Sequence, residues 1–340
     1  MKSEDTWLDL EKDNAVVVKN QIHKYLLTPS SSVDIYIGLI YPEKHRTLIF
    51  RTESDYVYKP ENFPDLKYFN IVIARLPEDP PEYGAIKIIL LDDDYKGIFS
   101  VLADDIINSV KTAKNKRQAI EFFYSRLSRW INFLESFGIR GLSMESARGL
   151  FGELWFLYTY LIKKENATSV ESWTGPKGTP QDFQFPGTAV EVKTTIMKQP
   201  QKIRVSNELQ LDDKGIENLF LFHLSVIERK DFGETLPSII RQIRGSFEEN
   251  IQNKSYFDQM LFDSGYLDEH AEHYASTGYT IRQESFFRIT DGFPRLIESD
   301  LPEGIGDLNY SVNVSSCSNF TVSGEFVIKT IKKTGKSNEN

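Results

Sequence analysis

The amino-acid sequence predicts a mixed α/β fold with a β-rich beginning, an α/β middle and an end that is helical and then β-rich. Three patterns predict it: alternating apolar segments before residue 110, apolar residues at helical spacing across 116–164, and a hairpin with a buried strand across 181–228. With 340 residues, 40% of them hydrophobic and 13% aromatic, the chain can bury a sizeable core. Global disorder is therefore excluded.

The first part, residues 1–115, is predicted to be mostly β-structure. Apolar residues alternate or cluster at 33–37, 71–73 and 86–91, and prolines separate these segments. A connecting helix is predicted over 116–139, because apolar residues recur there at helical spacing and Gly138 follows as a stop signal.

The core is predicted over residues 140–230. A helix that is apolar nearly all round, and hence buried, begins at Ser143 and runs to about Lys164. A buried strand is predicted over 218–228. The last part, 231–340, is predicted to be helical to about residue 272 and β-rich from about 279, with a frayed basic tail at 329–336.

Composition limits the classes of function. Forty basic and 49 acidic residues give a net charge of −9, which argues against a protein that coats nucleic acid indiscriminately. The single cysteine, Cys317, permits neither an intramolecular disulfide nor a cysteine-based zinc site. With no signal-peptide pattern at the start and no long apolar run, we expect a soluble, cytoplasmic protein that does not contact membranes.

The segment 181–193 is predicted to form a β-hairpin around the turn residues Pro186 and Gly187. With these two residues as the loop, residue 185 faces 188, 184 faces 189, 183 faces 190, and Asp182 faces Glu191. Because Pro-Gly is not a favoured two-residue hairpin turn, the register is predicted only to within one residue. Glu191 and Lys193 share one face of their strand.

Two carboxylates opposed across strands repel each other, and a divalent cation relieves this repulsion. Mg²⁺ suits one or two carboxylates together with water molecules. Lys193 beside Asp182 and Glu191 could orient a water or stabilise negative charge on a phosphate. This set of groups suits phosphodiester hydrolysis. The alternative is a surface hairpin that carries a structural Glu–Lys pair.

Glu153 is the only carboxylate between Glu145 and Glu165, within an otherwise apolar helix. A buried, unpaired carboxylate is costly, so Glu153 needs a partner. A metal ion or its bound water would serve. So would a backbone group, Arg148 or Lys193.

The order of a helical Glu153, then Asp182, then Glu191-Val192-Lys193 resembles the PD-(D/E)XK nuclease superfamily. The resemblance implies a restriction-endonuclease-like core and Mg²⁺-dependent cleavage of DNA, with Mn²⁺ as the alternative ion. Asp182, Glu191 and the backbone carbonyl of Val192 would hold the metal. Lys193 would assist the attacking water, and Glu153 would orient a second metal or a water.

A closer resemblance is to a bacterial family of PD-(D/E)XK-motif proteins of unassigned function, encoded beside methyltransferases and other restriction or phage-defence genes. The likeness extends to 187–211 and 291–295 and covers most of the chain. The sequence departs from the pattern at Gln181, where the motif has a proline; Pro180 stands one position earlier. That proline has no chemical role.

Candidate DNA contacts follow the hairpin. The window 193–204 contains no acidic residue and four basic ones: Lys193, Lys198, Lys202 and Arg204. It could track a phosphate backbone, or it could be a basic surface loop. The next helix is expected to begin with Ser206, Asn207 and Gln210. Its N-terminus could receive a phosphate, and Ser206 is also a good N-cap.

The sequence thus favours a Mg²⁺-dependent DNA endonuclease of a restriction or phage-defence system. One alternative is a non-cleaving subunit that binds DNA or a partner in a defence complex, and another is a Mg²⁺-dependent enzyme acting on a different phosphate substrate. A homodimer and a methyltransferase or other defence subunits are the expected partners. His223 is expected to be a satisfied core residue or to flank the site, and His270 and His273 to lie on a surface helix.

Overall fold

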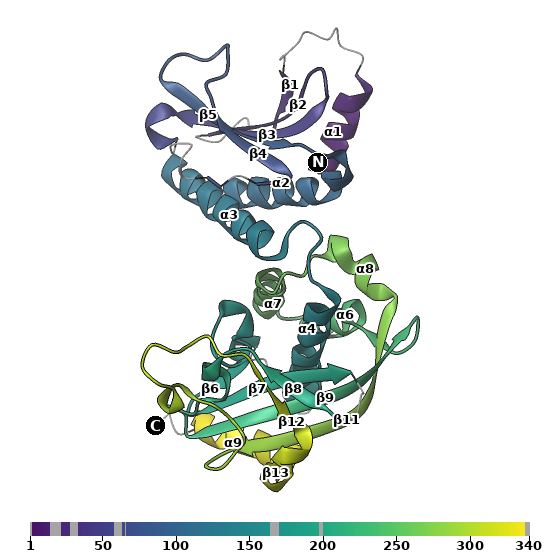
Figure 1. Cartoon of the computed structure of the whole chain (residues 1–340). Coiled ribbons are helices and arrows are strands. Elements are labelled where there is room, and N and C mark those ends of the chain that lie inside the picture. Colours follow the sequence, from purple (N-terminus) through teal and green to yellow (C-terminus); the bar gives the residue numbers. More distant parts are fainter. Residues whose placement is uncertain are drawn as a thin grey trace. The chain divides into compact units, whose positions relative to one another are not determined.

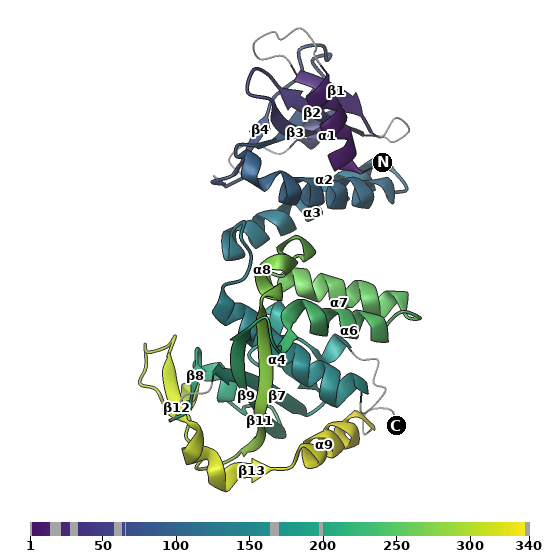
Figure 2. The ribbon, with the colours of Figure 1, turned by 90° about the vertical axis from the view of Figure 1, so that its right-hand side faces the viewer.

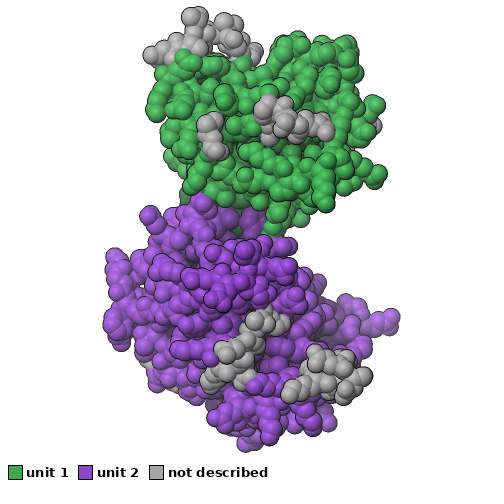
Figure 3. All heavy atoms as spheres, turned by 180° about the vertical axis from the view of Figure 1, so that it is seen from behind, with its two compact units in different colours: residues 1–140 green, residues 141–340 purple. Residues whose placement is uncertain are grey.

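The structure, a computed structural model, describes residues 2–13, 22–27, 33–57, 63–64, 66–163, 170–196 and 200–336. The chain divides into two compact units, Met1–Arg140 and Gly141–Asn340, which are coloured separately in Figure 3. The division into four parts derived from the sequence is finer than this and stays a prediction.

The first unit contains a five-stranded antiparallel sheet in the order β1-β2-β3-β5-β4 (Figure 1). Its strands are β1 (Ile22–Leu26), β2 (Asp34–Ile40), β3 (His45–Glu53), β4 (Phe69–Ile73) and β5 (Tyr83–Leu90). The segments predicted at 33–37, 71–73 and 86–91 correspond to β2, β4 and β5, so the prediction of strands in this part is confirmed.

Three helices complete the first unit: α1 (Ser3–Lys12), α2 (Lys96–Lys111) and α3 (Lys116–Phe137). Phe50 of β3 stacks on Phe123 of α3 with ring centroids 3.9 Å apart, and Trp7 of α1 packs on Phe99 of α2. The connecting helix predicted over 116–139 is α3, whose last turn ends at Gly138. The prediction missed α1 and α2, which interrupt the expected β-structure of 1–115. The short helices η1 (Ser54–Tyr56) and η3 (Asp93–Tyr95) also lie here.

The second unit is built on a six-stranded mixed sheet in the order β10-β11-β9-β7-β6, with β13 paired to β11. Its strands are β6 (Phe183–Phe185), β7 (Thr188–Ile196), β9 (Asn218–Lys230), β10 (Glu234–Thr235), β11 (Thr277–Ile289) and β13 (Thr321–Val322). β7 and β9 run parallel, and the other pairs are antiparallel. The parallel pair requires a crossover between β7 and β9.

Helix α4 (Met144–Phe156) packs on one face of this sheet and continues as the π-helical segment η4 (Leu157–Ile162). Its N-cap is Ser143, as predicted, since the Ser143 side chain accepts a hydrogen bond from the Ser146 N–H. The ring of Phe156 contacts the strand residues Phe183, Phe222 and Phe286. The helix is therefore buried against the strands that carry the candidate site.

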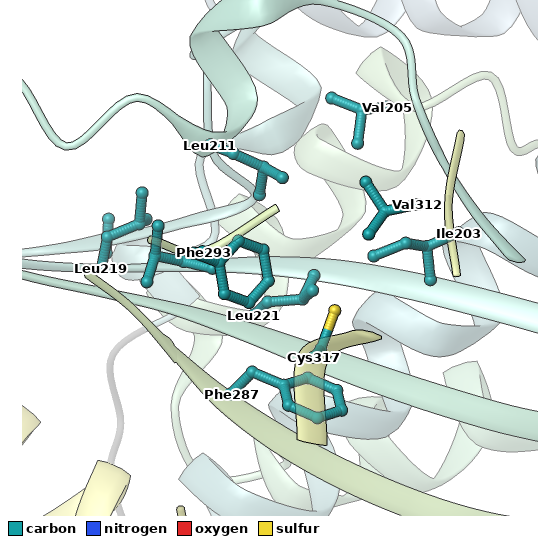
Figure 4. Close-up of a cluster of buried hydrophobic side chains, with 11 residues drawn as sticks. Ile203, Val205, Leu211, Leu219, Leu221, Phe287, Phe293, Val312 and Cys317 are labelled. Atoms are coloured by element: carbon teal, nitrogen blue, oxygen red, sulfur yellow. The ribbon is translucent and has the colours of Figure 1, made fainter. Parts of the chain in front are cut away.

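A two-stranded ribbon of β8 (Lys202–Val205) and β12 (Tyr310–Asn313) covers the other face. Figure 2 shows this ribbon on the side of the sheet opposite α4. A buried apolar cluster joins ribbon and sheet (Figure 4); it contains Ala189, Ile203, Val205, Leu211, Leu219, Leu221, Phe287, Ile289, Phe293, Val312 and Cys317.

The remaining helices are α6 (Leu236–Ser246), α7 (Ile251–Asp263), α8 (Ala271–Ala275), α9 (Gly324–Lys336), η5 (Val170–Ser172), η6 (Gly175–Lys177), η7 (Glu208–Leu211), η8 (Asp268–His270), η9 (Glu298–Asp300) and η10 (Val314–Phe320). The expectation of a frayed tail at 329–336 is wrong, because these residues belong to α9, where Phe326 packs on Phe220. His270 is buried rather than on the surface, whereas His273 is exposed. Within the described residues, no helix is both long and apolar enough to cross a bilayer.

Candidate active site

The hairpin of β6 and β7 opens into a fork at the candidate site. Phe183 pairs with Val190, Gln184 with Ala189 and Phe185 with Thr188, which is the predicted register. β6 begins at Phe183 while β7 continues to Ile196, so the far half of β7 pairs with β9 but not with β6. The gap between the two strands is where the acidic residues gather.

Asp182 occupies the mouth of this fork. Its Oδ2 accepts a hydrogen bond of 2.7 Å from the Val192 N–H, which replaces the missing ladder partner. Its backbone carbonyl accepts from the N–H groups of Thr174 and Gly175 at 2.8 and 3.0 Å. Since the N–H and C=O of one strand residue point to the same side, the Val192 carbonyl also faces the fork. The aspartate is thus fixed from both sides.

Glu191 is buried, with 1% of its surface exposed. Its Oε1 lies 2.7 Å from Lys193 Nζ, while Oε2 has no hydrogen-bond partner within the described part of the chain. Burial and the neighbouring Asp182 carboxylate raise the pKa of Glu191 to about 8, against the opposing effects of Lys193 and of the Asp182 backbone N–H. Glu191 therefore has an unsatisfied oxygen and lies beside a second carboxylate, that of Asp182, and a bound cation would neutralise this negative charge.

Lys193 lies between Glu191 and Gln210. Its Nζ donates a 2.9 Å hydrogen bond to Gln210 Oε1. Burial alone would lower the pKa of Lys193, but the carboxylates of Glu191 and Asp182 outweigh it and raise the pKa above its usual value. Lys193 is consequently an ammonium group, suited to stabilising negative charge rather than to accepting a proton.

Glu153 reaches the same site from α4. Its Oε2 accepts a 2.8 Å hydrogen bond from the indole N–H of Trp173. Burial first, and then the charge of Asp182, raise the pKa of Glu153 well above its ordinary value. A Cβ atom on Gly175 would lie 2.9 Å from Asp182 Oδ1 and 3.4 Å from Glu153 Oε2, so glycine leaves room beside both carboxylates.

The donor set fits a divalent cation. Glu191 offers an orphaned oxygen, the Val192 carbonyl faces the fork, and Gly175 leaves space beside Asp182 and Glu153. Among the described residues, no group of three or more Asp, Glu, His or Cys side chains is arranged as a complete metal cage. Mg²⁺ does not need one, because it usually keeps several waters and binds one or two carboxylates.

The predicted DNA-contacting residues are only partly brought to the site. Lys198 lies outside the described residues, and Lys202 and Arg204 are exposed on β8. The helix expected after β8 is a 3-10 helix of only four residues, η7, and its N-cap is Asn207 rather than Ser206. A turn this short offers no helical N-terminus for a phosphate.

Two residues of the site, Trp173 and Gly175, were not predicted from the sequence. Both belong to the segment that approaches Asp182, where Trp173 forms an isolated antiparallel β-bridge with Phe183. The sequence pattern that could have indicated them is a tryptophan and a turn glycine shortly before the motif. His223 is buried in β9, as predicted, and its Nε2 lies 2.8 Å from Thr195 Oγ1.

A helical glutamate beside a forked hairpin with Asp and Glu-X-Lys defines a PD-(D/E)XK-like core. The family described as "Putative PD-(D/E)XK family member, (DUF4420)" matches residues 3–315. The chain therefore belongs to this family, within a superfamily composed generally of nucleases. No curated protein and no solved structure matches the chain.

Proposed function

We propose that this protein is a Mg²⁺-dependent endonuclease that hydrolyses phosphodiester bonds of DNA. One observation carries the proposal: the buried Glu191, with its orphaned Oε2, lies beside Asp182 and the Lys193 ammonium at the open end of the hairpin. A structural Glu–Lys pair on a surface hairpin would have its carboxylate in water. Mn²⁺ is the alternative ion.

In this proposal Asp182, Glu191 and the Val192 carbonyl hold the cation, which would polarise the phosphate and lower the pKa of a bound water. Lys193 stabilises the negative charge that develops on the phosphate and orients the water. Glu153, fixed by Trp173, positions a second cation or a water through Oε1. Gln210 keeps Lys193 at the site.

A plasmid assay tests the proposal. The purified full chain is incubated with supercoiled DNA in Mg²⁺, in Mn²⁺ and with EDTA, and nicking and linearisation are followed on gels. Asp182→Asn and Lys193→Ala should each lower the cleavage rate constant by at least about 100-fold, in line with the loss of a preorganised charged group.

Glu272→Gln and Lys254→Ala serve as matched controls, because both residues are exposed on helices α8 and α7. They should cleave like the parent chain. Cleavage that survives Asp182→Asn and Lys193→Ala would refute the site. Metal-independent DNA binding without cleavage would favour a non-cleaving defence subunit, and cleavage of RNA or nucleotides alone would favour another phosphate substrate.

The proposal extends to a cytoplasmic restriction or phage-defence system, on the strength of the family resemblance. Double-strand breaks need two sites, so we propose a homodimer, with a methyltransferase or other defence subunits as further partners. Light scattering of the full chain with and without duplex DNA tests the dimer. Comparing methylated and unmethylated plasmids tests the link to modification.

A further inference from the structure

The ribbon of β8 and β12 has two different faces. Ile203, Val205 and Val312 point inward into the cluster of Figure 4 and are buried. The alternate residues point outward and are exposed: Lys202, Arg204, Ser311 and Asn313. The register places Ser311 opposite Arg204 and Asn313 opposite Lys202, so the outward residues form one compact patch, here called the ribbon face.

The ribbon face is polar and cationic. It carries two positive charges and no acidic side chain, within a chain of net charge −9. The Nε of Arg204 donates a 3.0 Å hydrogen bond to Asn309 Oδ1, which fixes one edge of the guanidinium. The other groups are an ammonium, an amide and a hydroxyl, all of which can bond the edges of bases.

The ribbon is tied to the catalytic lysine. Ser206 directly follows β8, and its N–H donates a 3.0 Å hydrogen bond to Gln210 Oε1, the same atom that accepts from Lys193 Nζ at 2.9 Å. Ile203 and Val205 pack in one cluster with Ala189, which shares a strand face with Glu191. The ribbon therefore covers the sheet face from which Glu191 and Lys193 project.

We propose that the ribbon face reads DNA sequence by entering the major groove of a duplex next to the cleaved phosphate; this rests on the proposed function. The major groove admits a two-stranded ribbon and carries the donor and acceptor pattern that distinguishes all four base pairs. Arg204 and Lys202 suit guanine, Asn313 suits adenine, and Ser311 suits either. Lys202 and Arg204 then do more than track phosphates.

The test is a binding selection from random duplexes with the full-length Lys193→Ala chain, which removes cleavage from the readout. Arg204→Ala and Asn313→Ala should each relax the preference at one base position by about 5- to 150-fold and leave the other positions unchanged. Replacing guanine by 7-deazaguanine at the position read by Arg204 should have a comparable effect. Arg241→Ala, an exposed arginine on α6, is the matched control and should leave all preferences intact.

A uniform loss of affinity with unchanged base preferences would overturn the inference, since it would show phosphate contacts alone. Binding only to single strands, RNA or protein would overturn it as well. If base preference depends on the ribbon face but the parent chain never cleaves DNA, the inference stands and the proposed nuclease activity is refuted. If the chain cleaves DNA but its choice of site does not change in Arg204→Ala and Asn313→Ala, the nuclease activity stands and the inference is refuted. Unchanged thermal unfolding of the variants verifies that each is folded.

Discussion

The Lys193 ammonium is held between a carboxylate and an amide. Glu191 Oε1 lies 2.7 Å from its Nζ and Gln210 Oε1 lies 2.9 Å from it. We predict that Gln210→Ala lowers the cleavage rate constant at saturating DNA by about 10- to 100-fold, because a supporting hydrogen bond to a reacting group is lost. KM for DNA should change little, since Gln210 positions Lys193 and does not bind substrate in this scheme. Steady-state kinetics on a short duplex measure both quantities.

Gln252→Ala, at an exposed position of α7, is the control for this substitution. The conservative Gln210→Glu variant keeps an acceptor oxygen and should recover part of the lost rate. A Gln210→Ala chain that cleaves at the parental rate would show that Glu191 alone fixes the lysine.

Glu191 makes the metal-free protein less stable as pH rises. The pKa of Glu191 is raised from 4.5 to about 8, so between these pH values the folded chain keeps a proton that the unfolded chain has released. The contribution of Glu191 to the stability of the folded chain is therefore most favourable below about pH 4.5 and decreases as the pH rises to about 8. We predict that Glu191→Gln, measured in EDTA, raises Tm at pH 8 by at least about 2–4 °C, or about 1 kcal/mol. The gain should shrink at pH 5.

The same variant separates metal binding from folding. Mg²⁺ at 100 times its Kd stabilises a folded chain by about 2.7 kcal/mol, and Glu191→Gln should remove most of this gain. Glu272→Gln should keep the parental response to both pH and Mg²⁺. A parental chain whose Tm ignores Mg²⁺ at pH 8 would contradict this account of the buried carboxylate.

At the scale of elements, the docking of α4 on β7 depends on a glycine. A Cβ atom on Gly152 would lie 1.7 Å from Thr194 Oγ1 and 3.1 Å from Thr194 Cβ. We predict that Gly152→Ala destabilises the chain by about 1–3 kcal/mol, because the helix must move off the strand. It should also reduce cleavage, since Glu153 is the next residue. Chemical denaturation measures the loss of stability.

Gly149 is the matched control on the same helix, since among the described residues no atom outside its own stretch of helix lies within 4 Å of a Cβ built there. Gly149→Ala should stabilise the chain by up to about 1 kcal/mol through helix propensity. Thr194→Ala should rescue part of the Gly152→Ala defect, which a double-mutant cycle detects. Equal effects at Gly149 and Gly152 would refute the close approach of helix and strand.

At the scale of the whole molecule, the second unit contains every proposed catalytic residue, from Glu153 to Lys193. We predict that residues 138–340 fold alone with cooperative unfolding and retain the stabilisation by Mg²⁺. Calorimetry with and without the ion measures this, with the Glu191→Gln form of the same fragment as control. A fragment that is unfolded or indifferent to Mg²⁺ would contradict this prediction.

The hairpin that carries the candidate site could be predicted because strand periodicity is strict. With Pro186 and Gly187 as the loop, residue 183 pairs with 190, and alternation along the strand places Glu191 and Lys193 on one face. The apolar content of α4 likewise predicted a buried helix that delivers an isolated carboxylate. Local patterns thus accounted for the elements that carry the motif.

Long-range contacts could not be predicted in the same way. The indole of Trp173 reaches Glu153 across twenty residues, and β12 pairs with a strand about a hundred residues earlier. Helix α2 was missed because its β-branched and aliphatic residues also suit a buried strand. The helix expected after β8 is limited to the single 3-10 turn of η7, which Asn207 caps and which ends at Leu211.

The ribbon of β8 and β12 also has a consequence for folding during synthesis, because its two strands are translated far apart in time. Lys193 leaves the ribosome long before Val312, whose side chain completes the apolar cluster beside β7. At ordinary elongation rates the interval is on the order of 10 s. Throughout this interval β8 lacks its partner strand, and Ile203 and Val205 lack the part of their apolar cluster that Val312 provides. We therefore expect a nascent or truncated chain that ends before β12 to expose this apolar cluster and to be prone to aggregation.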